Sequence, residues 1–158
     1  MAHTVHKPSL KVAPRGSGLL GPFALTADSI AAHVEPLSIG AYAAGRMRDG
    51  KFFVRAVGRD DRDLAAALGE LAGRYDAFKF RTYVSTRRAF EKECQLFHDF
   101  APPDTKAHPQ RPPGTRFVCP VQGCEYGGEP WGSAPSKEES SAPSKEEGGG
   151  AKDRRRDP

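Results

Sequence analysis

The dipeptide Asp49-Gly50, placed between two strand-like runs, constrains the fold of this chain more than any other feature. The runs are residues 37–47 (LSIGAYAAGRM) and 51–59 (KFFVRAVGR). A two-residue hairpin loop of type I′ requires positive φ at both central positions, and Asp-Gly tolerates this conformation. The sequence therefore predicts an antiparallel hairpin near the middle of the folded part.

Periodic patterns on either side of the hairpin complete a small domain. The elements expected beside it are a short helix over 26–33, a helix over 61–73, a strand over 78–85 and a last helix from 86 to about 100. In the third strand, alternation places Phe78, Phe80 and Val84 on one face. The order β-β-α-β-α, with a helix before it, predicts an α+β fold in which helices pack on a three-stranded antiparallel sheet.

The two ends of the chain differ from this core in composition. Residues 1–22 hold three basic groups, no acidic group and three prolines, which predicts a flexible basic arm. The tail 132–158 lacks large apolar residues after Gly132 and repeats SAPSKEE, so we expect it, like residues 1–20, to be disordered. The domain of interest is then 23–101, followed by a Pro-rich segment over 102–131.

Composition excludes several classes of protein. The chain carries a net charge of +4, but residues 23–101 hold 12 basic and 11 acidic groups, so the folded part is not a broad basic surface. No apolar run is long enough for a transmembrane helix, and the N-terminus has no apolar signal-peptide region. These features predict a cytoplasmic protein without membrane contact.

Glu93 stands out in the last helix. On a helical wheel it falls in the middle of the apolar face formed by residues such as Phe90, Leu96 and Phe97. A carboxylate there must be paired, protonated, bound to a metal or placed at the mouth of a cleft, because burying a lone charge is costly. Two interpretations stay open, namely a site glutamate and a structural salt bridge to a strand arginine.

All three cysteines fall into a pattern typical of a zinc site. Two ligands one helical turn apart in the last helix and a C-x4-C pair downstream would give a closed Cys₃His set: Cys94, His98, Cys119 and Cys124. Such a site would be structural and would hold the Pro-rich segment on the helix, with Phe117, Tyr126 and Trp131 as anchors. The alternative is a buried Cys94, an unrelated His98 and two ordinary thiols. His33 and His108 are less well placed as ligands.

Residues 37–100 resemble the GIY-YIG endonuclease superfamily. The likeness rests on Ile39-Gly40-Ala41-Tyr42, on Ala56-Val57-Gly58-Arg59, and on the following helix, strand and helix with its central Glu93. The resemblance implies the fold of that family and phosphodiester cleavage with one divalent metal ion. Carried over to this chain, it makes Tyr42, Glu93 and Arg59 the catalytic candidates, with Mg²⁺ at Glu93.

Two departures from the family pattern change the expected function. Ala56 stands where the second motif has tyrosine, and Ala67 stands where an arginine is expected, so a base and a phosphate-binding charge are missing. We therefore expect no ordinary nuclease activity, and a nucleic-acid-binding or interaction module with a structural zinc site. Contacts to DNA or RNA are expected from four arginines: Arg46, Arg55, Arg59 and Arg62.

Two alternatives remain for the function. One is an active Mg²⁺-dependent endonuclease with a rearranged site, in which Arg59 or Arg62 contacts the phosphate. The other is a zinc-stabilised scaffold that contacts a protein partner, for example through the tail. The near-neutral core favours the binding module and the scaffold over the nuclease, because phosphate contacts supply most non-specific affinity for DNA.

Overall fold

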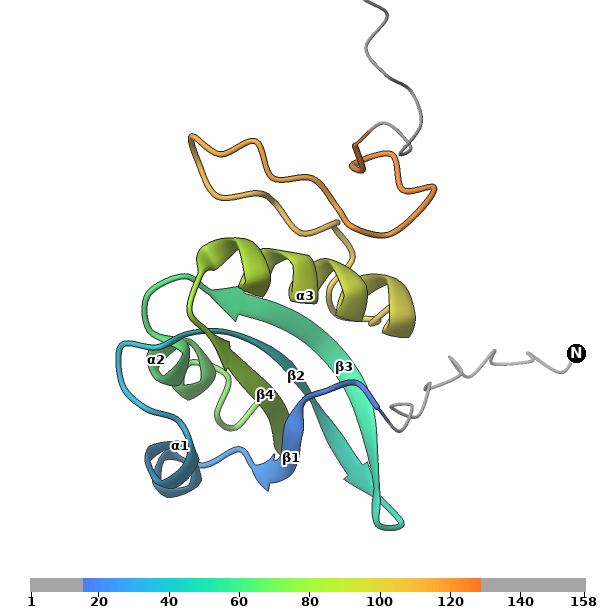
Figure 1. Ribbon diagram of the computed structural model, residues 1–158. Helices are drawn as coiled ribbons and strands as arrows, with labels where there is room; N and C mark the ends of the chain where they lie inside the picture. The colour runs from blue at the N-terminus through green and yellow to red at the C-terminus, as the bar shows by residue number, and fades with distance from the viewer. Residues whose placement is uncertain (1–15, 129–158) are drawn as a thin grey trace, which may run out of the picture.

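An antiparallel sheet of four strands organises the protein, with the strand order β1-β4-β2-β3. The computed structural model describes residues 16–128, so the predictions for most of the arm and for the repeat tail lie outside the described residues. The elements are β1 (Leu20–Ala24), α1 (Ala27–His33), β2 (Ile39–Arg48), β3 (Lys51–Asp60), α2 (Leu64–Gly69), β4 (Ala77–Tyr83) and α3 (Thr86–Phe100). Figure 1 shows α3 on one side of the sheet and α1 and α2 on the other.

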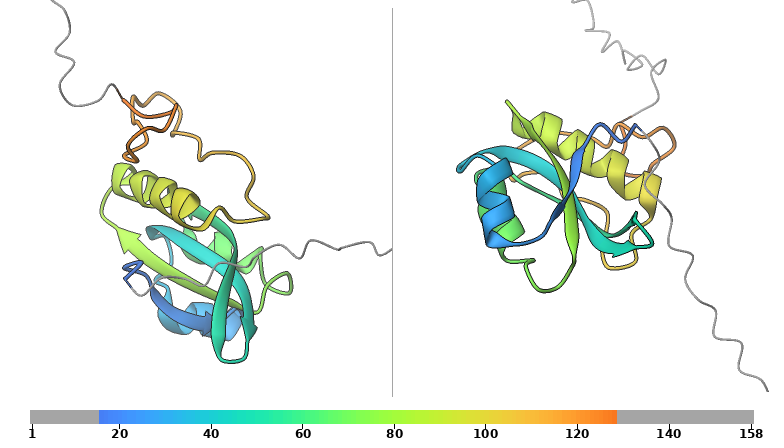
Figure 2. Two further views of the ribbon diagram at one scale, coloured as in Figure 1. Left: turned by 90° about the vertical axis from the view of Figure 1, so that its right-hand side faces the viewer. Right: turned by 90° about the horizontal axis from the view of Figure 1, so that it is seen from below.

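Each face of the sheet has its own apolar core. Leu96 and Phe100 of α3 pack against residues such as Val54 on one face. Phe78 and Leu64 belong to the core on the opposite face, beneath α1 and α2. Figure 2 shows the same three layers from two other sides. The two cores follow from the alternation of side chains along the strands, which sends successive residues to opposite faces.

The hairpin predicted at Asp49-Gly50 is confirmed. Its two turn residues have φ of 51° and 69°, as a type I′ turn requires, and Arg48 pairs with Lys51 across the turn. Further along, the register shifts between Ala44 and Gly45. A side chain at Gly45 would place its Cβ against the Phe53 carbonyl oxygen, so this irregularity depends on glycine.

Three expectations about the elements are corrected. The sheet has four strands, because β1 pairs with β4, and β1 begins within the segment 1–22 that was assigned to the flexible arm. The strand β1 was not predicted, because Gly21 and Pro22 are rare within strands. As an edge strand, β1 can nevertheless accommodate proline. β4 ends at Tyr83, and Val84 is fully exposed instead of sharing the face of Phe78.

Helix α2 is shorter than expected for a physical reason. The Asp60 carboxylate accepts hydrogen bonds from the backbone N–H groups of Arg62 (2.7 Å) and Asp63 (2.6 Å), which holds residues 60–63 in a turn. Asp63 then caps the helix by accepting a bond from the N–H of Ala66. The last helix, in contrast, starts as predicted, with Ser85 as its N-cap.

The Pro-rich segment after α3 follows the free edge of β3. The N–H of Asp104 donates to the carbonyl of Arg55 at 2.9 Å. The Thr105 hydroxyl accepts from the N–H of Val57 (3.1 Å) and lies 3.2 Å from its carbonyl oxygen, to which it donates. The segment thus satisfies an edge that would otherwise be open, and then turns back across α3 (Figure 1).

Residues 16–128 contain no helix that combines the length and the apolar character needed to cross a membrane.

Candidate metal centre and the neighbouring arginine–glutamate cleft

Four side chains gather beside α3 in an arrangement that could hold a metal ion such as zinc. The ligand atoms all lie within 4.8 Å of one another, and the residues are His98, His108, Cys119 and Cys124. Cys119 Sγ lies 3.5 Å from His98 Nε2, and Cys124 Sγ lies 3.5 Å from His108 Nε2. A thiolate and an imidazole nitrogen bound to one tetrahedral zinc are about 3.6 Å apart, so both distances fit this geometry.

A tight turn presents the two thiols. Cys119 bonds through its N–H to the carbonyl of Tyr126, and the N–H of Cys124 donates to the carbonyl of Val121. Gly123, with φ of 80°, allows the chain to reverse just before the second thiol. The N–H of Tyr126 donates to Cys124 Sγ at 3.4 Å, which fixes the position of this sulfur atom.

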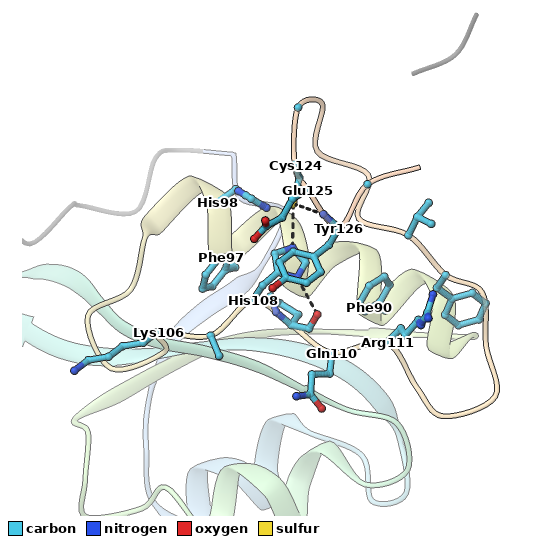
Figure 3. A pocket seen from close by; sticks show the side chains of 16 residues that line it. Phe90, Phe97, His98, Lys106, His108, Gln110, Arg111, Cys124, Glu125 and Tyr126 are labelled. Atoms are coloured by element: carbon cyan, nitrogen blue, oxygen red, sulfur yellow. Dashed lines mark hydrogen bonds between the residues drawn. The ribbon is translucent and has the colours of Figure 1, made fainter. Parts of the chain in front are cut away.

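His108 is oriented for ligation by its surroundings. Its Nδ1 lies 2.9 Å from the carbonyl oxygen of Pro109, which favours a proton on Nδ1 and leaves Nε2 free to bind a metal. The ring stacks on Tyr126 at 4.3 Å, and the edge of Phe97 contacts both His108 and His98. These residues line an open cavity of about 1140 Å³ between α3 and the 106–127 segment. Figure 3 shows the rings of Phe97, His108 and Tyr126 close together at this cavity.

The ligand set therefore differs from the predicted one at a single position. His98, Cys119 and Cys124 are brought together, but His108 occupies the place expected for Cys94. Cys94 is completely buried and packs with Phe90 and Cys119 behind the cluster. Burial raises the pKa of its thiol, and the neighbouring thiol of Cys119 raises it further.

Sequence reasoning missed His108 because it lies in a Pro-rich segment without periodicity. Helical spacing selected Cys94, one turn before His98, although its side chain is completely buried between Phe90 and Cys119. The usable signal was that a histidine precedes the C-x4-C turn on the same irregular segment, while Cys94 falls among the apolar residues of the helix. The anchors Phe117 and Tyr126 are observed near the cluster, and Trp131 lies outside the described residues.

Glu93 forms an ion pair with Arg59 from β3. Their side chains are only 12% and 11% exposed, and the contact joins Glu93 Oε2 to an η nitrogen of Arg59. Arg59 also bonds to Asp61 (3.1 Å) and to the carbonyl oxygen of Gln110 (2.8 Å), and its guanidinium lies 5.2 Å from the ring centre of Phe90. The salt bridge considered as one interpretation of Glu93 is thus present.

Burial and the charge of Arg59 shift the pKa of Glu93 in opposite directions. Desolvation raises the pKa of the carboxyl above its ordinary value, and the positive charge of Arg59 only partly offsets this rise. The pair borders a shallow open cleft of about 440 Å³ that contains three carboxylates and two arginines. It is lined by Arg59, Asp60, Asp61, Arg62, Glu93 and Gln110.

Tyr42 lies close to this cleft. It pairs with Gly58 across β2 and β3, and its ring covers the position that a side chain at residue 58 would need. Burial, together with the negative charge of Glu93, raises the pKa of Tyr42 to about 12. Its hydroxyl therefore stays protonated near neutral pH and is a poor general base.

The arginines expected to contact nucleic acid are mostly paired within the protein. Arg46 lies 3.4 Å from Asp76, and Arg55 bonds through two nitrogens to Asp104 at 2.7 and 3.3 Å. Arg59 is held as described above, and Arg62 lines the cleft. Ala56 is buried in the core beneath α1 and α2.

No family model, curated protein or solved structure matches this chain.

Proposed function

We propose that this protein is a nucleic-acid-binding module of GIY-YIG-like architecture that does not turn over phosphodiesters, with a structural zinc ion that fixes its C-terminal segment. The observation that supports the absence of turnover is the buried ion pair between Arg59 and Glu93, while the expectation of nucleic-acid binding comes from the resemblance of residues 37–100. The resemblance assigns Glu93 to a divalent metal ion, and in this chain an arginine occupies that carboxylate.

The ion pair is costly to open. Arg59 donates hydrogen bonds to three acceptors, on Glu93, Asp61 and Gln110. The side chains of Arg59 and Glu93 are both largely removed from solvent. Separating a buried pair leaves an uncompensated charge and costs about 3–5 kcal/mol. Binding of a magnesium ion at Glu93 would require this ion pair to open, at that cost in free energy. In addition, the chain has alanine at residues 56 and 67, where the GIY-YIG family has a base and a positive charge.

The metal centre supports a structural role and not a catalytic one. Two histidines and two cysteines would complete a tetrahedral zinc shell and leave no position for a substrate or a reactive water. The site joins α3, through His98, to the irregular segment that carries the other three ligands. Zinc would therefore stabilise a segment that has no helix or strand of its own.

Binding to nucleic acid is tested by a gel-shift titration of the full-length, zinc-loaded protein with labelled DNA and RNA at several salt concentrations. We expect binding that weakens steeply as salt rises, because counterion release from phosphates drives it. Absence of a shift with every nucleic acid at low salt would contradict the proposal and favour the scaffold for a protein partner. Metal-dependent cleavage that is lost in Glu93→Gln would favour the nuclease.

A further inference from the structure

We propose that the nucleic-acid backbone binds along a strip of four cations between β4 and α3, and not in the arginine–glutamate cleft. The residues of this β4–α3 strip are Lys79, Arg81, Arg88 and Lys92. The inference rests on the proposed function, since it names the surface that performs it. Its occupant is a chain of phosphates, recognised by a row of positive charges beside a tyrosine.

The fold brings these four residues together from two elements. Alternation along β4 places Lys79, Arg81 and Tyr83 on the sheet face that carries α3, opposite the buried Phe78 and Phe80. α3 packs mainly over β2 and β3, so this part of β4 is only partly covered.

Two residues of α3 complete the strip from the helix side. Arg88 and Lys92 lie one helical turn apart, on the flank of α3. Arg81 Nη1 and Lys92 Nζ approach the same residue, Gly18, and lie 3.6 and 3.7 Å from where its Cβ would be.

The charges of the strip are not neutralised by the protein. Within residues 16–128, none of the four cations forms an ion pair, whereas Arg46, Arg55 and Arg59 each do. Burial lowers the pKa of Lys92, and Asp99 is the acidic group that opposes this shift while Arg81 reinforces it. At the start of α3, Arg87 is paired with Glu91 and adds no free charge. Repulsion within the strip is relieved when phosphates bind.

The start of the described chain lies beside the strip. Gly18 accepts a hydrogen bond from Arg81 at 3.1 Å. The strip together with Asp99 carries +3, while the whole chain carries a net charge of only +4. The strip therefore accounts for most of the net positive charge of the chain.

Tyr83 favours a nucleic acid over other acidic partners. Its ring is half-buried beside the strip, close enough to Arg81 and Arg88 for their charges to oppose the rise in its pKa caused by burial. An aromatic ring between cations is the arrangement on which unpaired bases stack while the backbone follows the charges. Acidic peptides and lipid headgroups offer no bases that could stack on such a ring.

The test compares two double variants by fluorescence anisotropy. The probes are a labelled single strand of about 20 nucleotides, the matching duplex, and vesicles that contain phosphatidylserine, measured from 50 to 200 mM NaCl. The strip variant is Arg81→Gln/Lys92→Gln. The control, Arg48→Gln/Lys51→Gln, removes the same charge at the hairpin tip, seven residues along β2 from the partner of Arg81.

We expect the strip variant to bind the single strand about 25-fold more weakly at 100 mM NaCl, because each lost phosphate contact costs about fivefold at a salt slope of 0.7. Its salt slope should fall by about 1.4, and the control should stay within about twofold of the wild type. Tyr83→Ala should weaken the single strand more than the duplex.

Other outcomes overturn the inference in distinguishable ways. Equal losses in both double variants would show a general charge effect without a specific surface. If the strip variant binds with the affinity of the wild type and Arg62→Gln does not bind, the nucleic acid lies in the cleft. In that case the strip is wrong and the proposed function still holds. If the wild type binds no nucleic acid, or binds only the vesicles, both the strip and the proposed function are wrong.

Discussion

Replacing Arg59 by methionine should expose the cost of the buried carboxylate that it neutralises. Methionine keeps the contact with Phe90 but removes the charge that offsets Glu93, whose side chain is only 12% exposed. We expect the free energy of unfolding at pH 7 to fall by about 3 kcal/mol or more, in the range found for broken buried pairs. The matched exposed pair gives the control, since Arg46→Met should cost less than about 1 kcal/mol.

The same variant should show a distinctive pH dependence. Glu93 already has a raised pKa in the folded state, and loss of Arg59 removes the charge that counteracts this rise. A carboxyl with a raised folded pKa contributes stability that is present below its unfolded pKa, about 4.3, and is lost as pH rises through the folded pKa. The deficit of Arg59→Met relative to wild type should therefore shrink as pH falls from 8 toward 5.

Urea unfolding of the wild type, Arg59→Met, Glu93→Gln and the double variant measures this directly. The double variant should be more stable than Arg59→Met, because it no longer buries an unpaired carboxylate. A deficit below about 1 kcal/mol at pH 7, or one that is the same at pH 5 and pH 8, would refute the reasoning about the pair.

Three further predictions concern the metal centre, the edge of β3 and the tyrosine. Protein prepared without chelator should hold about one zinc ion per chain by elemental analysis; His108→Ala should reduce this content, and Cys94→Ala should retain it. Hydrogen bonds from Arg55 and Tyr75 outweigh the effect of burial and lower the pKa of Asp104. The stabilising effect of Asp104 should therefore be present above pH 4 and disappear below it. A comparison of the unfolding free energy of Asp104→Asn and of the wild type over a series of pH values would detect this. Gly58→Ala should lower the unfolding free energy by about 1–3 kcal/mol, because its Cβ would lie 2.5 Å from the Tyr42 hydroxyl, and Tyr42→Leu should restore part of the loss.

The elements that could be predicted from the sequence are those with a strong local signal. Asp49-Gly50 specifies its own turn, and the last helix begins at Thr86, as its pattern predicts. β1 could not be found, because a five-residue edge strand with Gly21 and Pro22 has no local signature and exists through its pairing with β4. Val84 was misplaced because alternation alone does not say where a strand ends.

The residues of the candidate metal centre were predicted in part for a related reason. Cys119 and Cys124 share a local turn, and His98 is fixed by the helix, so their type and spacing indicate a zinc site. The fourth ligand depends on the path of residues 101–110, which is set by contacts to the edge of β3 and leaves no periodic pattern in the sequence. Only the fold decides between His108 and Cys94.

The central claim is a module that binds nucleic acid without cutting it, and one native agarose gel tests both halves. Full-length, zinc-loaded protein is incubated with supercoiled plasmid and Mg²⁺, half of each sample is run directly, and half is run after removal of protein. We expect retarded plasmid in the first half and intact supercoiled plasmid in the second. Nicked plasmid that disappears with Glu93→Gln would contradict the claim, and so would a failure to retard both the plasmid and a single-stranded DNA run beside it.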